Sequence, residues 1–205
     1  MEYIISAVVG YLFGCVNVAY IIGKIKGVNI KKTGTNNAGA SNVFISVGKI
    51  YGVFAAIGDI LKSFFAALII YSVFDSFELA VIAGMVAVIG HIFPFWMKFN
   101  GGKGLASIMG LILFYDIFYP GTFVVMGLLL VIITLATDFI ALGSVTIATV
   151  MPIFILIFDL ETKKLAFWFA ILMVIVWYKH RENIKRIRNK TEIGFLRKNK
   201  IKKEP

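Results

Sequence analysis

Two polar segments rich in glycine interrupt a strongly apolar sequence, and their residues have the chemistry to hold an anion. We name residues 33–42 the first polar loop and residues 101–104, which include Lys103, the glycine–lysine turn. Glycine allows a backbone to approach a ligand closely and to point several N–H groups at one anion, most often a phosphate. Together with a lysine and neutral hydrogen-bond donors, these segments predict a site for a phosphorylated small molecule.

The first polar loop offers more donors than an ordinary turn needs. Lys31 and Lys32 add positive charge just before it. The alternative interpretation is a polar connection in which Ser41 or Asn42 caps the next helix. The candidate phosphate-binding residues of this loop are Thr35, Asn37, Gly39, Ser41 and Asn42.

The glycine–lysine turn is not a nucleotide-binding P-loop. Gly104 follows Lys103 where that motif requires Ser or Thr, and Met97 stands at the position of its first glycine. What remains is a lysine in a glycine turn before an apolar span, where helix N-terminal amides favour anions. The alternative is a plain basic residue at a flexible turn. The candidates here are Gly101, Gly102, Lys103 and Gly104.

A third set of candidates lies on the last predicted helix. His180, Asn183 and Arg186 follow one another at three-residue steps and therefore share a helix face. The face offers an imidazole, an amide and a guanidinium for binding or proton transfer. The alternative is a basic helix end that reaches toward lipid headgroups. Glu192 is placed to pair locally with an Arg or Lys.

Three further polar residues fall inside predicted spans. Asp59 and Lys62 are one helical turn apart and predict an internal ion pair that also shapes the phosphate site. His91 lies three residues before Pro94 and is either a helix-packing residue or part of the site. The two histidines are far apart in sequence and the chain has one cysteine, so we expect no metal site and no cofactor.

The composition predicts an all-α integral membrane protein. About 60% of the 205 residues are hydrophobic, and a helix needs roughly 20 apolar residues to cross a bilayer. The segment before residue 24 has no cationic start, so we interpret it as a retained helix. Two of the spans are short, so six crossings are an alternative to seven. The seven predicted spans are residues 4–22, 51–74, 79–96, 105–118, 122–136, 139–158 and 165–177.

The charge distribution predicts the orientation. With the N-terminus outside and seven crossings, nearly all Lys and Arg residues fall inside, and Lys163 and Lys164 fall outside. The C-terminus is then cytoplasmic, together with motif segments at about 31–50, 98–104 and 179–195. The net charge of +10 suits anionic lipid headgroups, and we expect no nucleic-acid partner. No internal repeat supports a transporter, so we expect one domain, residues 1–205.

Three motifs carry a resemblance to a known family. They are GTNNAGASN at residues 34–42, GHIFP at 90–94 continuing to FNGGKG at 99–104, and HRENIKR at 180–186. In this order the motifs resemble those of the bacterial acyl-phosphate:glycerol-3-phosphate acyltransferases, the PlsY family. The resemblance implies a seven-helix protein of the bacterial cell membrane with its active site at the cytoplasmic face. It implies acyl transfer from acyl phosphate to the 1-hydroxyl of glycerol 3-phosphate, giving lysophosphatidic acid and phosphate.

The resemblance also implies roles for residues. Lys103, His180 and Asn183 are the expected catalytic residues, and Arg186, His91 and the loop candidates are expected to bind substrate. Acyl phosphate is already activated, so the protein must align two anionic substrates and neutralise the leaving phosphate. The proton of the hydroxyl passes either to His180 or to a phosphate oxygen. The acyl chain is expected to lie between helices.

The sequence departs from the family pattern at several positions. Ile45 stands where the family usually has an arginine, for which Lys49 or Arg186 could substitute. Lys190 replaces a usual glycine. Thr35, Asn36 and Ala38 replace a usual serine, glycine and proline. Because position 45 lacks a cation that could bind phosphate bidentately, one alternative function is that of a weakly catalytic paralogue that binds acyl phosphate. A carrier for glycerol phosphate or phosphate is the other.

Overall fold

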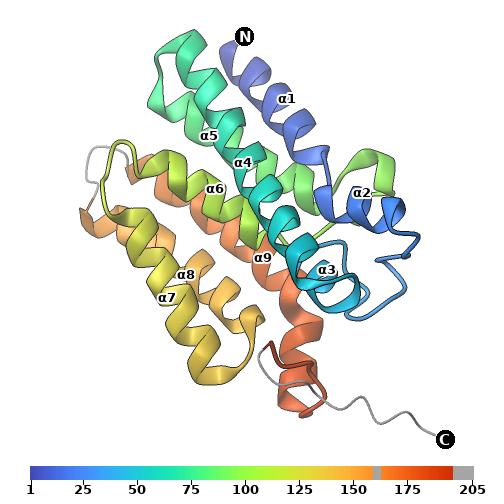
Figure 1. Ribbon diagram of the computed structural model, residues 1–205. Coiled ribbons are helices and arrows are strands. Elements are labelled where there is room, and N and C mark those ends of the chain that lie inside the picture. The colour runs from blue at the N-terminus through green and yellow to red at the C-terminus, as the bar shows by residue number, and fades with distance from the viewer. Residues whose placement is uncertain (159–162, 196–205) are drawn as a thin grey trace, which may run out of the picture. The chain divides into compact units, whose positions relative to one another are not determined.

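The structure, a computed structural model, describes residues 1–158 and 163–195. Every regular element in these two ranges is helical (Figure 1), so the all-α prediction is confirmed. The chain divides into two compact units, Met1–Phe123 and Val124–Pro205, which are described separately below. The single domain stays a prediction. The elements are α1 (Glu2–Cys15), α2 (Val18–Ile25), α3 (Ala40–Ser46), α4 (Lys49–Phe74), α5 (Phe77–Ile92), the 3-10 turn η1 (Phe95–Met97), α6 (Leu105–Tyr115), α7 (Thr122–Thr137), α8 (Ile140–Phe158) and α9 (Lys163–Arg188).

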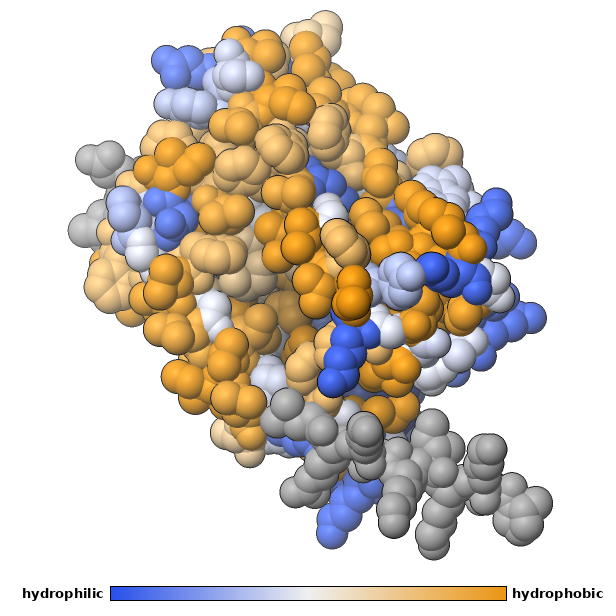
Figure 2. All heavy atoms as spheres, viewed as in Figure 1, coloured by the Kyte–Doolittle hydropathy of each residue, from blue (hydrophilic) through white to orange (hydrophobic). Residues whose placement is uncertain are grey.

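Several helical stretches are long and apolar enough to cross a bilayer. Among the described residues they are Glu2–Ile25, Lys49–Phe74, Phe77–Met97 and Ile140–Phe158, and α6 and α7 are shorter apolar helices. Large apolar side chains such as Leu12, Phe54 and Leu135 are exposed, and such side chains dominate the face shown in Figure 2. Lipid solvates exposed apolar side chains, whereas the backbone must be satisfied within helices. The structure is that of a multi-pass integral membrane protein.

The first predicted span is not one continuous helix, contrary to our expectation for residues 4–22. Helix α1 ends at Cys15, and α2 begins at Val18 after Asn17. The Asn17 side chain is buried, and its Oδ1 accepts a hydrogen bond of 2.7 Å from the Tyr20 N–H. An asparagine that caps a new helix offers the backbone an alternative to continuing the old one, which explains the break.

The backbone carbonyl groups that lose their intrahelical hydrogen bonds at this break accept hydrogen bonds from side chains elsewhere in the first unit. The indole nitrogen of Trp96 donates to the Cys15 carbonyl at 2.8 Å. The Lys62 ammonium donates to the Val16 carbonyl at 2.7 Å. Because buried backbone acceptors must be paired, these two side chains make the break tolerable within an apolar segment.

Small residues allow helices of the first unit to pack closely. Gly10 and Gly14 of α1 face Ala83 and Ala87 of α5, and a side chain on either glycine would collide with an alanine carbonyl. Helix α1 accordingly lies alongside α5 (Figure 1). Small residues spaced four apart are typical of close helix pairs in membranes. This contact was not predicted from the sequence.

The second unit contains most of α7 together with α8 and α9. Trp177 of α9 donates to the hydroxyl of Thr149 on α8 at 3.0 Å. After α9, the chain folds back so that the Phe195 N–H donates to the Asp138 carbonyl in the α7–α8 connection at 2.8 Å. Residues 159–162, between the predicted spans 139–158 and 165–177, and residues 196–205, which include five lysine and arginine residues expected at the cytoplasmic face, lie outside the described residues.

Candidate active site

Asn42 organises the first polar loop from inside. Its side chain is fully buried. Its Oδ1 accepts the Thr35 N–H at 2.8 Å, which fixes the backbone where the loop turns. The amide is therefore saturated by the chain itself, and its contacts shape the loop. The Nδ2 atom of Asn42 lies 2.8, 2.9 and 3.0 Å from the carbonyl oxygens of Ile30, Thr33 and Asn37, and the Ser46 hydroxyl donates to Oδ1 at 3.2 Å.

The alternative that Ser41 or Asn42 caps the next helix is wrong. Helix α3 begins at Ala40, and the residue before it, Gly39, makes no side-chain capping bond. The side chains of Thr35, Asn37 and Ser41 are half-buried. Each of these three predicted residues is therefore partly exposed and accessible to a ligand.

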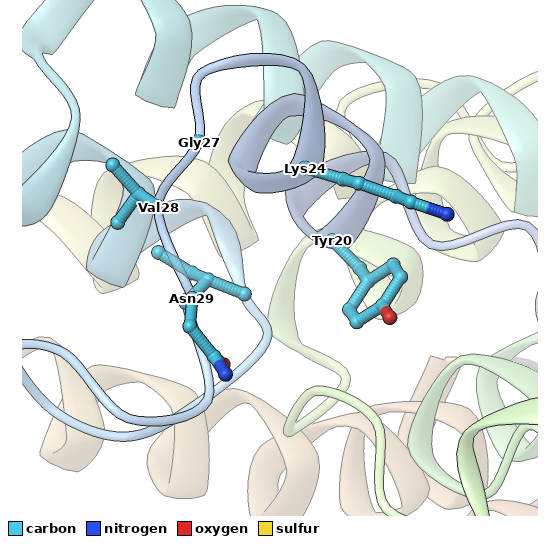
Figure 3. A pocket seen from close by; sticks show the side chains of 6 residues that line it. Tyr20, Lys24, Gly27, Val28 and Asn29 are labelled. Carbon is cyan, nitrogen blue, oxygen red and sulfur yellow. The ribbon is translucent and has the colours of Figure 1, made fainter.

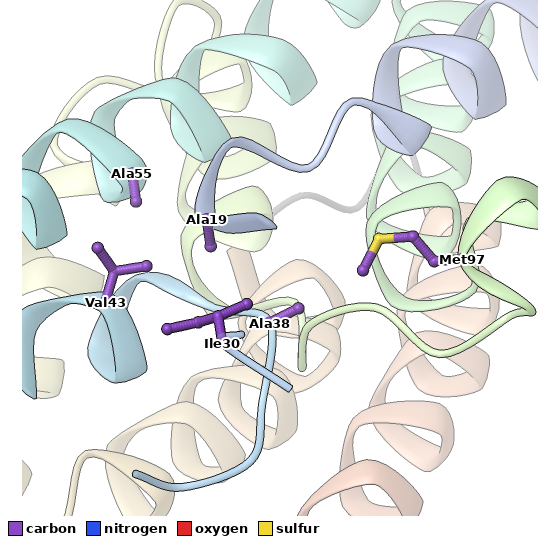
Figure 4. Close-up of a cluster of buried hydrophobic side chains, with 6 residues drawn as sticks. All are labelled: Ala19, Ile30, Ala38, Val43, Ala55 and Met97. Carbon is purple, nitrogen blue, oxygen red and sulfur yellow. The ribbon is translucent and has the colours of Figure 1, made fainter. Parts of the chain in front are cut away.

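The first polar loop and the glycine–lysine turn lie together in the first unit. Asn17 donates to the Ala38 carbonyl at 3.1 Å, and the Lys31 ammonium to the Met97 carbonyl at 3.4 Å. A buried apolar cluster joins Ala38 of the first polar loop to Met97, which precedes the glycine–lysine turn (Figure 4). A side chain built on Gly102 of that turn would come within 3.0 Å of the Ala38 carbonyl. The structure therefore brings two of the three motifs together. The cluster consists of Ala19, Ile30, Ala38, Val43, Ala55 and Met97.

The two leading glycines of the glycine–lysine turn pack against the end of α5. The Gly101 N–H donates to the Ile92 carbonyl at 3.0 Å and the Gly102 N–H to the His91 carbonyl at 3.1 Å. A side chain on Gly102 would collide with the His91 ring. These N–H groups are thus used within the chain, and the turn holds Lys103, whose side chain is half-buried, at the start of α6.

The predicted ion pair between Asp59 and Lys62 is confirmed, and it contains a third member. Lys62 Nζ lies 2.7 Å from Asp59 Oδ1 and 2.7 Å from His91 Nδ1. All three side chains are buried. The ring of His91 therefore bonds a lysine of the neighbouring helix α4.

The third motif forms its own hydrogen-bonded group in the second unit. His180 and Asn183 are buried. Asn183 Nδ2 and Arg186 Nε each donate to the Glu192 carboxylate at 2.6 Å, so the predicted local partner of Glu192 is Arg186. His180 Nδ1 lies 2.9 Å from the Val176 carbonyl. Because a carbonyl only accepts, Nδ1 carries the proton, and a neutral His180 offers Nε2 as an acceptor.

Two departures from the family pattern occur where the backbone is left-handed. Asn36 has φ of 55° and Lys190 has φ of 60°, a region in which glycine is the usual residue. The left-handed backbone explains why the family usually has glycine at these positions. After glycine, asparagine is among the residues that adopt this conformation most readily. Ile45 lies on α3 with 42% of its surface exposed.

A hollow of about 260 Å³ lies beside the end of α2 (Figure 3). Tyr20 and Lys24 come from α2, and Asn29 comes from the following loop. These residues were not predicted from the sequence, which gives no signal for a hollow formed by a helix end and a loop. The proposed reaction below does not use them.

The helical fold and the apolar surface are those of a multi-pass membrane protein. Comparison with known protein families and structures identifies the family. The profile of the glycerol-3-phosphate acyltransferase family matches residues 4–190. Glycerol-3-phosphate acyltransferase 1 of Oceanobacillus iheyensis is 36% identical over 94% of both chains. The Bacillus subtilis glycerol-3-phosphate acyltransferase is 36% identical over 90% of this chain and 93% of its own.

A solved membrane protein has the same fold. The crystal structure of PlsY, an integral membrane glycerol 3-phosphate acyltransferase, in its glycerol 3-phosphate form has a TM-score of 0.85 and 30% identity, covering 95% of this chain and 96% of that chain. The lysophosphatidic acid form gives a TM-score of 0.83. The chain belongs to the glycerol-3-phosphate acyltransferase family, as the three motifs indicated.

Proposed function

We propose that this protein transfers a fatty acyl group from acyl phosphate to the 1-hydroxyl of glycerol 3-phosphate. The products are lysophosphatidic acid and inorganic phosphate. One observation carries the proposal most directly: the turn bearing Lys103 lies against the first polar loop, since a side chain built on Gly102 would come within 3.0 Å of the Ala38 carbonyl. Two segments that suit phosphate groups, placed side by side, fit a reaction between two phosphate-bearing substrates. The family membership supports the same reaction.

The residues of the first unit have distinct proposed roles. Lys103 neutralises the phosphate as the bond from the acyl carbon to the phosphate oxygen breaks. Thr35, Asn37 and Ser41 contact phosphate oxygens from their half-buried positions. Asn42, Gly101 and Gly102 shape the loops, since the Asn42 amide and the N–H groups of both glycines are bonded within the chain.

The third motif is assigned to the same reaction because of its resemblance to the family motif. As the ester bond forms, the hydroxyl proton passes to His180 Nε2 or to an oxygen of the departing phosphate. The bond from Nδ1 to Val176 suits the first route because it leaves Nε2 as an acceptor in the neutral ring. Asn183 and Arg186 are held by Glu192 in a fixed arrangement for contact with substrate.

We also propose seven crossings of a bacterial cell membrane, with the N-terminus outside, the C-terminus cytoplasmic and the active site facing the cytoplasm. Helix α6 has 11 residues and is about 17 Å long, shorter than a hydrocarbon core of about 30 Å. Non-helical backbone completes such a crossing only where protein surrounds it or where it lines a cavity. Gly101, Gly102 and Gly104 are buried, which suits a turn that enters the protein to form a site.

Replacing Lys103 tests the proposed function. We expect Lys103→Ala to lower acyl transfer by a factor of about 100 or more, because removal of a preorganised charge from a developing anion costs that much. The matched control is Lys98→Ala, which removes an exposed lysine five residues away and is expected to retain activity. Full turnover by Lys103→Ala would reject the role of Lys103.

The exposed isoleucine on α3 favours one alternative, a weakly catalytic protein that binds acyl phosphate. If position 45 limits catalysis, Ile45→Arg raises turnover, because an arginine clamps phosphate bidentately. An unchanged rate would show that the chain neutralises its substrates without that arginine.

A further inference from the structure

A buried lysine joins three helical segments at the base of the glycine–lysine turn. The Lys62 ammonium lies 2.7 Å from each of three atoms: Asp59 Oδ1, His91 Nδ1 and the Val16 carbonyl. An ammonium has three N–H groups and no acceptor. The ammonium donates to the Val16 carbonyl at the break after α1 and is hydrogen-bonded to His91 of α5, and it forms an ion pair with Asp59 of its own helix.

This arrangement determines the proton position on His91. A protonated Lys62 only donates, so in that state His91 Nδ1 accepts from it and a neutral ring carries its proton on Nε2. His91 Nδ1 is also 3.3 Å from Asp59 Oδ1. A proton on Nδ1 would pair with Asp59 but would face the ammonium at 2.7 Å, so the shorter contact decides the tautomer.

The Nε2 side of the ring faces the junction of the two phosphate-binding segments. A side chain built on Gly102 would collide with His91 Nε2 and come within 3.0 Å of the Ala38 carbonyl. The donor side of His91 therefore lies where the glycine–lysine turn meets the first polar loop. Movement of the ring would move Gly102, and Lys103 follows Gly102 directly.

We propose that Lys62, paired with Asp59, fixes the tautomer and orientation of His91, and that His91 is thereby a positioning residue for the junction at which the two phosphate-bearing substrates, glycerol 3-phosphate among them, bind. The proposal rests on the proposed function of that junction. In this proposal His91 acts through the junction, in place of the direct substrate contact that the family resemblance implies. It differs from His180, whose proton lies on Nδ1.

Nitrogen NMR of histidine measures the tautomer directly. The chain has only two histidines, so protein labelled with ¹⁵N-histidine gives two imidazole spectra, and His180→Gln assigns them. We expect His91 to be neutral, with an unprotonated Nδ1 and a protonated Nε2. A proton on Nδ1, or on both nitrogens, would overturn the proposal. This measurement does not depend on enzymatic activity, so its outcome is separate from that of the proposed function.

Two replacements of His91 separate positioning from simple packing. His91→Asn keeps an acceptor for Lys62 but cannot reach the junction, and we expect the KM for glycerol 3-phosphate to rise about tenfold with kcat changed less than about threefold. His91→Gln keeps an amide at the position of Nε2 and is expected to restore much of the lost affinity. An unchanged KM in His91→Asn would contradict the positioning role.

Ser63→Ala is the control for these variants. It removes a buried hydroxyl that has no hydrogen-bond partner in the described part of the chain and that lies next to Lys62. We expect its KM and kcat to match those of the unmodified protein. A KM rise in Ser63→Ala equal to that in His91→Asn would mean that any change near α4 has this effect, and the assignment to His91 would fail.

Discussion

At the scale of single residues, the same amino acid serves opposite purposes within the first polar loop. Asn42 is fully buried and bonds the backbone on both sides of the loop. Asn36 is exposed and tolerates a left-handed backbone. Their sequence neighbourhoods do not separate these roles, because both lie in one run of small polar residues. The difference arises from α3, which turns Asn42 inward.

The two asparagines provide a matched test. Asn42→Asp replaces donor N–H groups by a charged oxygen facing backbone carbonyls, and we expect the free energy of unfolding to fall by about 2–3 kcal/mol. Asn36→Asp makes the same chemical change at the surface and is expected to alter it by less than about 0.5 kcal/mol. Denaturant unfolding in detergent, with acyl transfer measured in parallel, checks both. Equal losses would contradict the organising role of Asn42.

The sequence predicted the polar contacts that are local in the chain. Helical spacing indicated the pair of Asp59 and Lys62, and the short separation indicated a partner for Glu192. It did not predict that His91 joins Lys62, since that contact requires two helices to be placed side by side. For the same reason it suggested a ligand role for the N–H groups of Gly101 and Gly102, which bond the end of α5.

At the scale of elements, the end of α9 shows how a family glycine can be replaced. The Lys190 N–H donates to the Ile187 carbonyl at 3.0 Å and the Thr191 N–H to the Arg186 carbonyl at 2.8 Å. This pair of bonds is the Schellman motif, which places a left-handed residue after the helix. Lys190 occupies that position at a cost in backbone strain.

Lys190→Gly tests this explanation. We expect the variant to be more stable by about 1 kcal/mol, because glycine has no steric penalty in the left-handed region. Asn189→Gly is the control, since Asn189 is not among the positive-φ residues, and glycine there is expected to lower stability. Unfolding in detergent measures both. A loss of stability in Lys190→Gly would contradict the assigned strain.

The contact between α1 and α5 depends on the absence of side chains at two positions. We expect Gly14→Leu to lower the free energy of unfolding by about 3 kcal/mol or more, because the added side chain meets the Ala87 backbone. Val8→Leu enlarges an exposed side chain on the same helix and is expected to have little effect. The yield and unfolding of folded protein compare them, and a harmless Gly14→Leu would refute the close contact.

Helix boundaries were predicted well where apolar runs end at polar residues, as for α4, α7 and α8. They were predicted poorly inside apolar runs. The break before Asn17 was missed because its partners, Trp96 and Lys62, come from distant parts of the chain. Helix α6 is shorter than predicted and ends at Tyr115.

At the scale of the whole molecule, composition and motif order were sufficient to indicate a membrane protein and its family. The proposed orientation rests on the distribution of basic residues. In this proposed orientation, the first polar loop and the glycine–lysine turn face the cytoplasm and its soluble glycerol 3-phosphate.

Cysteine labelling tests this orientation. The native Cys15 is buried and is the only cysteine, so Cys15→Ala provides a background for single reporters. We expect a membrane-impermeant thiol reagent to label Pro120→Cys in intact cells and Lys32→Cys only after permeabilisation; both positions are exposed. The reverse pattern would invert the proposed topology.

The most direct measurement of the central claim is phosphate release by purified protein given acyl phosphate, with and without glycerol 3-phosphate. We predict that release depends on glycerol 3-phosphate and that lysophosphatidic acid forms in equal amount. The equality matters because one phosphate leaves for each ester bond formed. No release from a folded preparation, or release without lysophosphatidic acid, would contradict the account.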